Sequence, residues 1–333
     1  MIYWIEFLIL VVIIFFAGKN LVKYGDILAE KLNIGRSIIG LIFIASVTSL
    51  PELITGISAA AYVQSPDLVA GEIFGSCMAN LFLLAILDAF VRDQPLTTKV
   101  HHGFTLSSAF GIMLITFAGI SLLLDDIIPS IGWISVSSFV IILIYIIALK
   151  ITTDYERRLI KIAVREVAEE LQYEKVQLKE VIIKSIFFSI LIIIAAIFLP
   201  DVGHKITEIF GLSETFFGSL FIAISTSLPE LAVSIAAIRL NLVQIAVANL
   251  LGSNIFNVFI LPIADIFYMK GSIFADMNSI NLLPASFSVL MTSIVIAGLI
   301  YKAEKKLLPL AYETIILIFI YIIGIYIIFV ASY

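Results

Sequence analysis

Residues 40–53 read GLIFIASVTSLPEL, and residues 218–231 read GSLFIAISTSLPEL. The two stretches agree at ten of 14 positions, at an offset of 178 residues. Downstream in each half, GSCMANLF at 75–82 matches GSNIFNVF at 252–259 at an offset of 177. Two motifs in the same order and at nearly the same offset indicate that the chain is an internal duplication.

The composition places both copies in a membrane. The 333 residues are 61% hydrophobic and 14% charged, with a mean hydropathy of +1.14, whereas soluble domains carry about 45–50% apolar and about 25% charged residues. A bilayer accommodates this apolar surface, and a water-soluble fold does not. The net charge of −5, without a basic patch, argues against a nucleic-acid partner. The single cysteine, Cys77, excludes an intrachain disulfide.

Ten segments are long and apolar enough to cross a bilayer as helices of about 20 residues. They are roughly 4–24, 37–63, 67–91, 103–124, 130–150, 181–200, 213–238, 242–267, 281–301 and 308–331. Turn signals such as Ser65-Pro66 and Pro200-Asp201 fall where loops are expected. The polar stretch 151–180 divides the chain into five spans within 1–150 and five within 181–333.

An odd number of spans separates the two copies, so the second copy is inverted in the membrane. We therefore expect an all-α polytopic membrane protein with ten transmembrane helices in two inverted five-helix repeats. The segment 151–180 joins them, and its charges and helical apolar spacing predict a helical linker. If this linker is cytoplasmic, 18 of the 20 Lys and Arg residues lie inside, as the positive-inside rule requires. Both termini then lie outside a cell membrane, and one site per chain favours a functional monomer.

Glu52 and Glu230 end the two repeated motifs, about 15 residues into their spans. That depth is about 22 Å along a helix. A carboxylate at such a depth is costly, so it predicts a functional site. Pro51 and Pro229 directly precede the glutamates, and proline removes a backbone donor and breaks the helix one turn back.

Each predicted break offers a carboxylate, hydroxyls and freed carbonyls. The hydroxyls belong to Thr48, Ser49, Thr226 and Ser227, and the freed carbonyls fall near 45–48 and 223–226. Such oxygens suit Ca²⁺, which takes 6–8 of them. The absence of His and Cys from residues 40–53 and 218–231 argues against zinc or copper.

The next helix of each repeat carries a polar stripe at a spacing of four residues, which keeps the side chains on one face. The stripes are Glu72, Ser76 and Asn80 in the first repeat and Asn249, Ser253 and Asn257 in the second. For each residue alone, interhelical hydrogen bonding is the alternative to ion binding. Gly75 and Gly252, each directly before the serine of a stripe, permit a close approach of another backbone.

Three further acids have two interpretations each. Glu72 is either a third titratable ligand near the external mouth or an interfacial acid in water. Asp88 and Asp265 each follow the last asparagine of a stripe by eight residues. They mark the ends of the ion pathway or form structural contacts.

Two carboxylates neutralise one Ca²⁺, two Na⁺ or two H⁺, so competition for Glu52 and Glu230 would by itself produce exchange. The residues therefore favour an antiporter that moves Ca²⁺ against Na⁺ or against H⁺, with no resident cofactor. A channel is a further hypothesis, because two proline breaks could line a pore. Enzyme activity is not expected, since no HExxH or GxSxG motif is present.

The paired TSLPE motifs, the polar stripes and the ten-span layout resemble the cation/Ca²⁺ exchanger superfamily, in particular prokaryotic Na⁺/Ca²⁺ exchangers. The resemblance implies antiport by alternating access. By position it implies that Glu52, Glu230, Thr48 and Thr226 coordinate Ca²⁺. It also implies that the coupling cations are bound by Ser49, Ser227, Ser76, Ser253 and the carbonyls of Ala45 and Ala223, with Asn80 and Asn257 at the centre.

The chain departs from the pattern of that superfamily at several places. Val47 and Ser225 stand where the family usually has glycine before the TSLPE threonine. Glu72 stands where many members have asparagine. Asn80 and Asn257 are both neutral, whereas some Na⁺-driven members have aspartate at one of these positions. These differences leave the ion stoichiometry and any K⁺ co-transport open.

Overall fold

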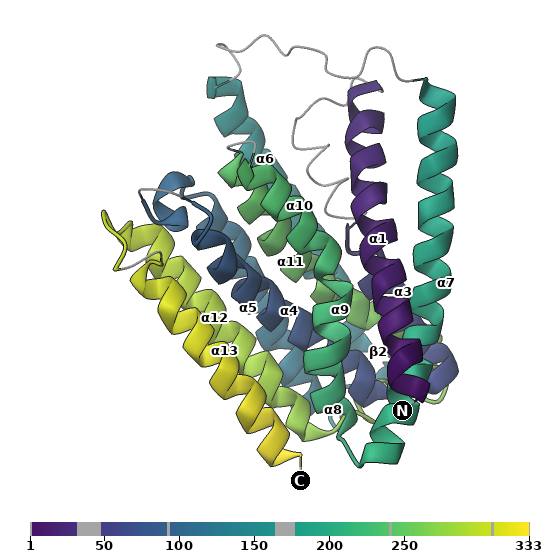
Figure 1. The fold of residues 1–333 in the computed structure, drawn as a ribbon. Coiled ribbons are helices and arrows are strands. Elements are labelled where there is room, and N and C mark those ends of the chain that lie inside the picture. The colour runs from purple at the N-terminus through teal and green to yellow at the C-terminus, as the bar shows by residue number, and fades with distance from the viewer. Residues whose placement is uncertain are drawn as a thin grey trace.

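The computed structural model describes residues 2–31, 48–91, 94–163, 177–239, 242–307 and 310–332. These residues form a helical bundle with one short β-hairpin (Figure 1). The elements of the first half are α1 (Ile2–Lys31), α3 (Leu50–Ser58), η1 (Ala59–Val63), α4 (Pro66–Asp88), η2 (Leu96–Lys99), α5 (Phe104–Leu123), β1 (Ser130–Ile131), β2 (Ile134–Ser135) and α6 (Val136–Ala163). Those of the second half are α7 (Leu178–Phe210), α8 (Glu214–Phe217), η3 (Gly218–Ile222), α9 (Ala223–Thr226), α10 (Leu228–Arg239), α11 (Val243–Phe267), η4 (Ser279–Asn281), α12 (Leu282–Tyr301) and α13 (Tyr312–Ala331).

The described residues contain eight helices long and apolar enough to cross a membrane, or nine if the bent pair from Glu214 to Arg239 is one span. A shorter apolar helix, Leu50–Val63, follows residues 32–47, which lie outside the described ranges. The prediction of a helical protein with many spans is therefore confirmed. The count of ten helices in two repeats stays a prediction.

Both termini lie at one end of the bundle, and the facing ends of α6 and α7 lie at the other (Figure 1). The side of the membrane on which the termini and the 151–180 segment lie stays a prediction. α4 and α11 are the most buried of the spans. The two long helices α1 and α7 pack side by side and contact the elements α3, α9 and α10. Gly18 of α1 approaches so closely that a Cβ there would lie 2.6 Å from Cγ of Pro229.

Two expected boundaries are wrong. The first is the loop predicted at Pro200, because α7 continues through this proline and ends only before Gly211. Proline deletes one hydrogen bond of a helix but does not oblige a long apolar helix to stop. Gly211 has φ 65°, the left-handed conformation that ends many helices.

The second difference concerns the fifth span, expected over 130–150. Residues 130–135 instead form the hairpin β1–β2, where Ser130 pairs with Ser135 and Gly132 has φ +67°. A glycine with positive φ at the first loop position suits a two-residue hairpin turn. The helix α6 then runs on to Ala163, because nothing between 151 and 163 interrupts it. The fold is thus helical with one small sheet, and part of the expected linker continues α6.

Gly75 allows α4 to touch the backbone of η3. A Cβ at this position would lie 2.3 Å from Cα of Ser219 and 2.7 Å from its carbonyl oxygen. Real Cβ atoms do not approach backbone atoms this closely, so the two elements would have to separate. The prediction that Gly75 permits a close backbone approach is confirmed.

We expect Gly75→Ala to lower the free energy of unfolding by about 1–3 kcal/mol, the usual effect of overpacking. Thermal unfolding in detergent, followed by circular dichroism, measures this effect. Gly111→Ala is the matched control, because no described atom outside the adjoining backbone of α5 lies within 4 Å of a Cβ built at Gly111. Equal stability of both variants would contradict the close contact between α4 and η3.

Candidate ion-binding site

Each TSLPE motif contains a turn, at Ser49 in the first repeat and at Ser227 in the second. Ser49 has φ −85° and ψ 13°, and Ser227 has φ −82° and ψ 2°, so both leave the helical conformation at equivalent positions. The helix resumes at the following leucine, which puts proline in the new first turn, where its missing N–H removes no helical hydrogen bond. In the second repeat the two stretches are bent by 43°. Glu52 and Glu230 therefore stand in the first turn of α3 and α10.

The two glutamates are held by serines of the opposite repeat. Ser49 Oγ donates a hydrogen bond of 3.0 Å to Oε1 of Glu230, and Ser227 Oγ donates one of 3.3 Å to Oε1 of Glu52. Both carboxylates are at most 1% exposed. The two contacts mirror each other, because offset 178 relates both the serines and the glutamates. The site is therefore shared between the two broken helices.

Several buried polar atoms in this region have no partner among the described residues. They are Oε2 of both Glu52 and Glu230, Oγ of Ser76, Oδ1 of Asn80, and both side-chain polar atoms of Asn257. Buried polar atoms are normally hydrogen-bonded, and exceptions point to water, ions or function. All the oxygens in this set are of the type that hard cations bind. The concentration of unpartnered oxygens fits a cation site.

The second polar stripe contacts the first broken helix. Ser253 Oγ accepts a hydrogen bond of 3.0 Å from Ser49 Oγ and donates one of 3.4 Å to Oε1 of Glu230. Asn249 Oδ1 accepts from Thr48 Oγ1 at 3.3 Å. Thr48, Ser49, Ser253 and Glu230, selected from two separate motifs, thus lie together in the structure.

The hydroxyl of Thr226 donates along its own helix, to the carbonyls of Ile222 at 3.1 Å and Ala223 at 3.3 Å. The Ala223 carbonyl also accepts from the Ser227 N–H at 3.1 Å. Thr226 remains buried at the break, and its oxygen keeps its lone pairs for a ligand. The carbonyl of Ala45 lies outside the described residues, so its part in the site stays a prediction.

Asn254 belongs to this region and was not singled out from the sequence. Its Oδ1 accepts a hydrogen bond of 3.0 Å from Asn80 Nδ2, and its Nδ2 donates to the Cys77 carbonyl at 3.2 Å. Asn254 and Cys77 are equivalent positions at offset 177. In the sequence, Asn254 directly follows the stripe residue Ser253 and therefore does not share the stripe's helical face. Only the tertiary structure shows that Asn254 joins α4 to α11.

Glu72 is 1% exposed, so the interpretation of an interfacial acid in water is wrong. One of its carboxylate oxygens, Oε1, accepts a hydrogen bond from Thr55 Oγ1, and the other, Oε2, has no partner among the described residues. Within those same residues no three His, Cys, Asp or Glu side chains are grouped to share one metal ion. An ion held between Glu52 and Glu230 would complete its shell with neutral oxygens.

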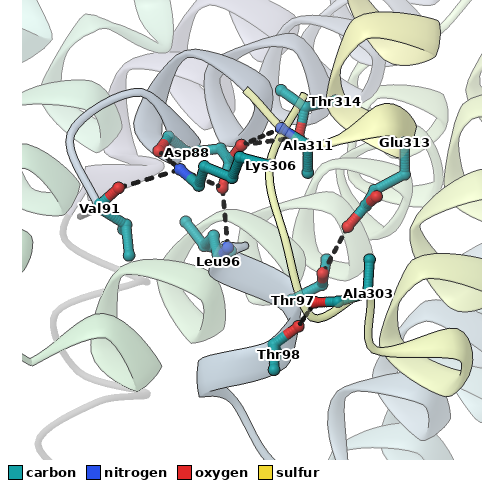
Figure 2. Close-up of polar contacts among 10 residues, drawn as sticks. All are labelled: Asp88, Val91, Leu96, Thr97, Thr98, Ala303, Lys306, Ala311, Glu313 and Thr314. Atoms are coloured by element: carbon teal, nitrogen blue, oxygen red, sulfur yellow. Dashed lines mark hydrogen bonds and ion pairs between the residues drawn. The ribbon is translucent and has the colours of Figure 1, made fainter. Parts of the chain in front are cut away.

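Asp88 connects the end of α4 to two loops (Figure 2). Its carboxylate accepts hydrogen bonds from the backbone N–H groups of Leu96 at 2.7 Å and Ala311 at 2.8 Å. It also forms an ion pair of 3.0 Å with Lys306, whose ammonium donates to the carbonyls of Asp88 and Val91. These contacts favour the structural interpretation of Asp88.

Asp265 has the equivalent role at the end of α11. Its carboxylate accepts from the N–H groups of Ser135 and Ile273, both at 2.8 Å, and from Ser138 Oγ at 2.6 Å. It thereby joins the β-hairpin and the loop after α11 to one helix end. The two repeat-related aspartates thus both anchor loops.

Solved structures share this fold. The H⁺/Ca²⁺ exchanger CAX matches with a TM-score of 0.73 at 15% identity, covering 99% of this chain and 85% of that chain. The sodium-calcium exchanger NCX_Mj matches with a TM-score of 0.60 at 22% identity, covering 97% of each chain. At these identities the likeness establishes the fold and leaves the transported ions to other evidence.

Proteins related in sequence are also membrane proteins and exchangers. The inner membrane protein YrbG of Escherichia coli K12 is 30% identical over 257 residues, which cover 75% of this chain and 74% of YrbG. The sodium/calcium exchanger MaX1 of Methanosarcina acetivorans is 26% identical over 299 residues, covering 79% of this chain and 83% of MaX1. The family model described as sodium/calcium exchanger protein matches residues 2–153 and 181–330, on both sides of the linker. The resemblance noted from the motifs is confirmed, and the protein belongs to the sodium/calcium exchanger family of multi-pass membrane transporters.

Proposed function

We propose that the protein is an antiporter that moves Ca²⁺ across the cell membrane in exchange for Na⁺, by alternating access. The observation that carries this proposal is the mirrored pair of contacts Ser49–Glu230 and Ser227–Glu52. Each contact leaves the second oxygen of a buried carboxylate without a partner among the described residues. Each carboxylate therefore has one hydrogen-bonded oxygen and one oxygen left for a ligand. A divalent cation bound between them would neutralise both negative charges.

Charge explains why such a site exchanges ions. Two buried carboxylates balance one Ca²⁺ or two Na⁺, and leaving them unbalanced in a low-dielectric interior is costly. Ca²⁺ and Na⁺ therefore compete for Glu52 and Glu230, and the carrier changes sides with one load or the other. Broken helices from two inverted repeats are the usual framework for such a motion.

We assign the remaining oxygens by position. Thr48 and Thr226 complete the Ca²⁺ position with the two glutamates. The coupling cations take the hydroxyls of Ser49, Ser227, Ser76 and Ser253 and the carbonyls of Ala45 and Ala223. Asn80 and Asn257 line the centre with neutral amide oxygens, which can ligate Na⁺ without adding charge.

Proteoliposomes test the choice of counter-ion, with ⁴⁵Ca²⁺ uptake measured under an outward Na⁺ gradient and, separately, an outward H⁺ gradient. We expect uptake with Na⁺ alone. Uptake driven only by H⁺ would replace this proposal with an H⁺/Ca²⁺ antiporter, because the same glutamates can carry protons. Uptake that needs no counter-ion would instead indicate a channel.

We also propose that the 151–180 segment faces the cytoplasm and both termini face outside, because this orientation places 18 of the 20 basic residues inside. We expect Gln177→Cys to react with a membrane-impermeant maleimide only from the cytoplasmic side, and Asp126→Cys only from outside. The native Cys77 is buried and does not interfere. The reverse pattern of labelling would overturn the orientation.

Activity at a dilution of one chain per vesicle would support a functional monomer.

A further inference from the structure

The polar stripes of the two repeats differ at one position, four residues before the shared serine. The first stripe has the acid Glu72 there, and the second has the amide Asn249. The neighbouring broken helix differs as well, because Thr55 and Gly56 of the first repeat correspond to Val233 and Ser234 of the second. The two repeats thus differ together on both facing helices.

In the second repeat, every polar atom of the Asn249 side chain has a hydrogen-bond partner. Its Nδ2 donates to the Glu230 carbonyl and to Ser234 Oγ, both at 3.2 Å, and its Oδ1 accepts from Thr48 at 3.3 Å. The amide therefore joins α11 to α10 and adds no charge that a cation would have to balance.

In the first repeat, the carboxylate of Glu72 accepts only one hydrogen bond from the described residues. Its Oε1 accepts from Thr55 Oγ1, while Oε2 lies beside Gly56, where a Cβ would be 3.9 Å away. Because glycine replaces the serine of the second repeat, no hydroxyl fills this space. Oε2 has no hydrogen-bond partner among the residues that the structure describes.

The charge of Glu72 is uncompensated as well. No Lys, Arg or His within the described ranges forms an ion pair with it. A carboxylate buried in this way is neutralised either by a bound cation or by a proton, because transfer of an unpaired charge from water is very unfavourable.

We propose that Glu72, with the hydroxyl of Thr55, forms a third cation position, which takes one Na⁺ of the coupling load and not Ca²⁺. One carboxylate and one hydroxyl match a single positive charge. The inference rests on the proposed Na⁺/Ca²⁺ exchange and adds one Na⁺ to those that Glu52 and Glu230 can hold. The exchange cycle of the wild type therefore moves one more Na⁺ per Ca²⁺ than the paired glutamates alone would allow.

The test uses Glu72→Asn, which introduces the residue of the second repeat, and Glu72→Gln, which keeps the length. Proteoliposomes are loaded with graded Na⁺, and ⁴⁵Ca²⁺ uptake and the reversal potential are recorded. We expect the Hill coefficient for Na⁺ and the charge moved per Ca²⁺ each to fall by about one. The Na⁺ concentration for half-maximal uptake should rise about tenfold, as loss of about 1.4 kcal/mol of binding produces. The Ca²⁺ concentration for half-maximal uptake should change less than about twofold, a difference below 0.5 kcal/mol.

Thr55→Val introduces the second-repeat residue at the partner position, and we expect it to raise the half-maximal Na⁺ concentration in the same direction. Glu180→Gln is the matched control, since it removes an equal charge from an exposed ion pair with Lys184. An unchanged Na⁺ count in both Glu72 variants would overturn the inference while leaving exchange intact. A shifted pH profile with an unchanged Na⁺ count would mean that Glu72 carries a proton instead. Absence of Na⁺-driven uptake in the wild type would be a failure of the proposed function itself.

Discussion

Glutamine at position 52 or 230 will abolish Na⁺-driven Ca²⁺ uptake, with a loss of at least about 100-fold in either variant. Groups that merely orient a metal ligand change affinity by about 10–100-fold, and Glu52 and Glu230 are proposed as the ligands themselves. Glutamine keeps the volume of the side chain but removes the charge that balances Ca²⁺. Each glutamate also accepts a hydrogen bond from the opposite repeat, so both substitutions affect the same shared site.

Binding of Ca²⁺ to purified protein, measured by isothermal titration calorimetry, separates loss of the site from loss of movement. We expect neither glutamine variant to bind Ca²⁺ at concentrations that saturate the wild type. Glu304→Gln is the matched control, because Glu304 is exposed in the loop after α12. Ca²⁺ binding or transport that survives in both Glu52→Gln and Glu230→Gln would rule out the paired-glutamate site.

Asparagine at position 88 will lower the free energy of unfolding by about 3 kcal/mol or more, the usual effect of breaking one partner of a buried ion pair. Lys306 is 9% exposed on its side chain and Asp88 is 2% exposed, so neither charge is well hydrated. Without the carboxylate, the ammonium of Lys306 loses its acidic partner and keeps its hydrogen bonds to the carbonyls of Asp88 and Val91. The backbone N–H groups of Leu96 and Ala311 lose a charged acceptor at the same time.

Cys77 provides the measurement, because it is the single thiol of the chain and is buried in α4. A thiol-reactive fluorophore will label it only as the protein unfolds, so labelling against temperature gives the transition. Asp126→Asn, which changes an exposed aspartate in a turn, should leave the transition unchanged. Replacing Lys306 with Met in addition to Asp88→Asn should recover part of the stability, since the buried ammonium that has lost its carboxylate is then gone. A transition of Asp88→Asn equal to that of the wild type would mean that Asp88 does not anchor the loops.

Residues close together in the sequence were the most predictable part of the site. Pro51 and Pro229 predict helix breaks because a proline removes a backbone donor and clashes with the carbonyl one turn back. At Pro229 the structure shows such a break, with a bend of 43° between Glu214–Thr226 and Leu228–Arg239. The spacing of Ser253 and Asn257 predicts a common face because the helical repeat is local. The depth of Glu230 in the membrane follows from counting residues and stays a prediction.

Contacts between distant elements were not predictable in the same way. The sequence left two interpretations for Asp88, and only the approach of the loop containing Lys306, more than 200 residues away, distinguishes them. The sequence also left two interpretations for Glu72, a titratable ligand or an interfacial acid in water, and only its burial excludes the second. The continuation of α7 through Pro200 depends on surroundings that supply what the proline removes.

The sequence by itself determined that the chain crosses a membrane, that it is duplicated and that each copy carries one acid at a proline break. Composition, repetition and helical periodicity are properties of the chain alone and need no coordinates. Only the tertiary structure decided that Ser49 donates a hydrogen bond to Glu230 and Ser227 donates one to Glu52. The same holds for Glu72, which has one carboxylate oxygen without a partner among the described residues. These pairings depend on how two distant helices are placed against each other, and hydrogen bonds of about 3 Å are fixed only by that packing.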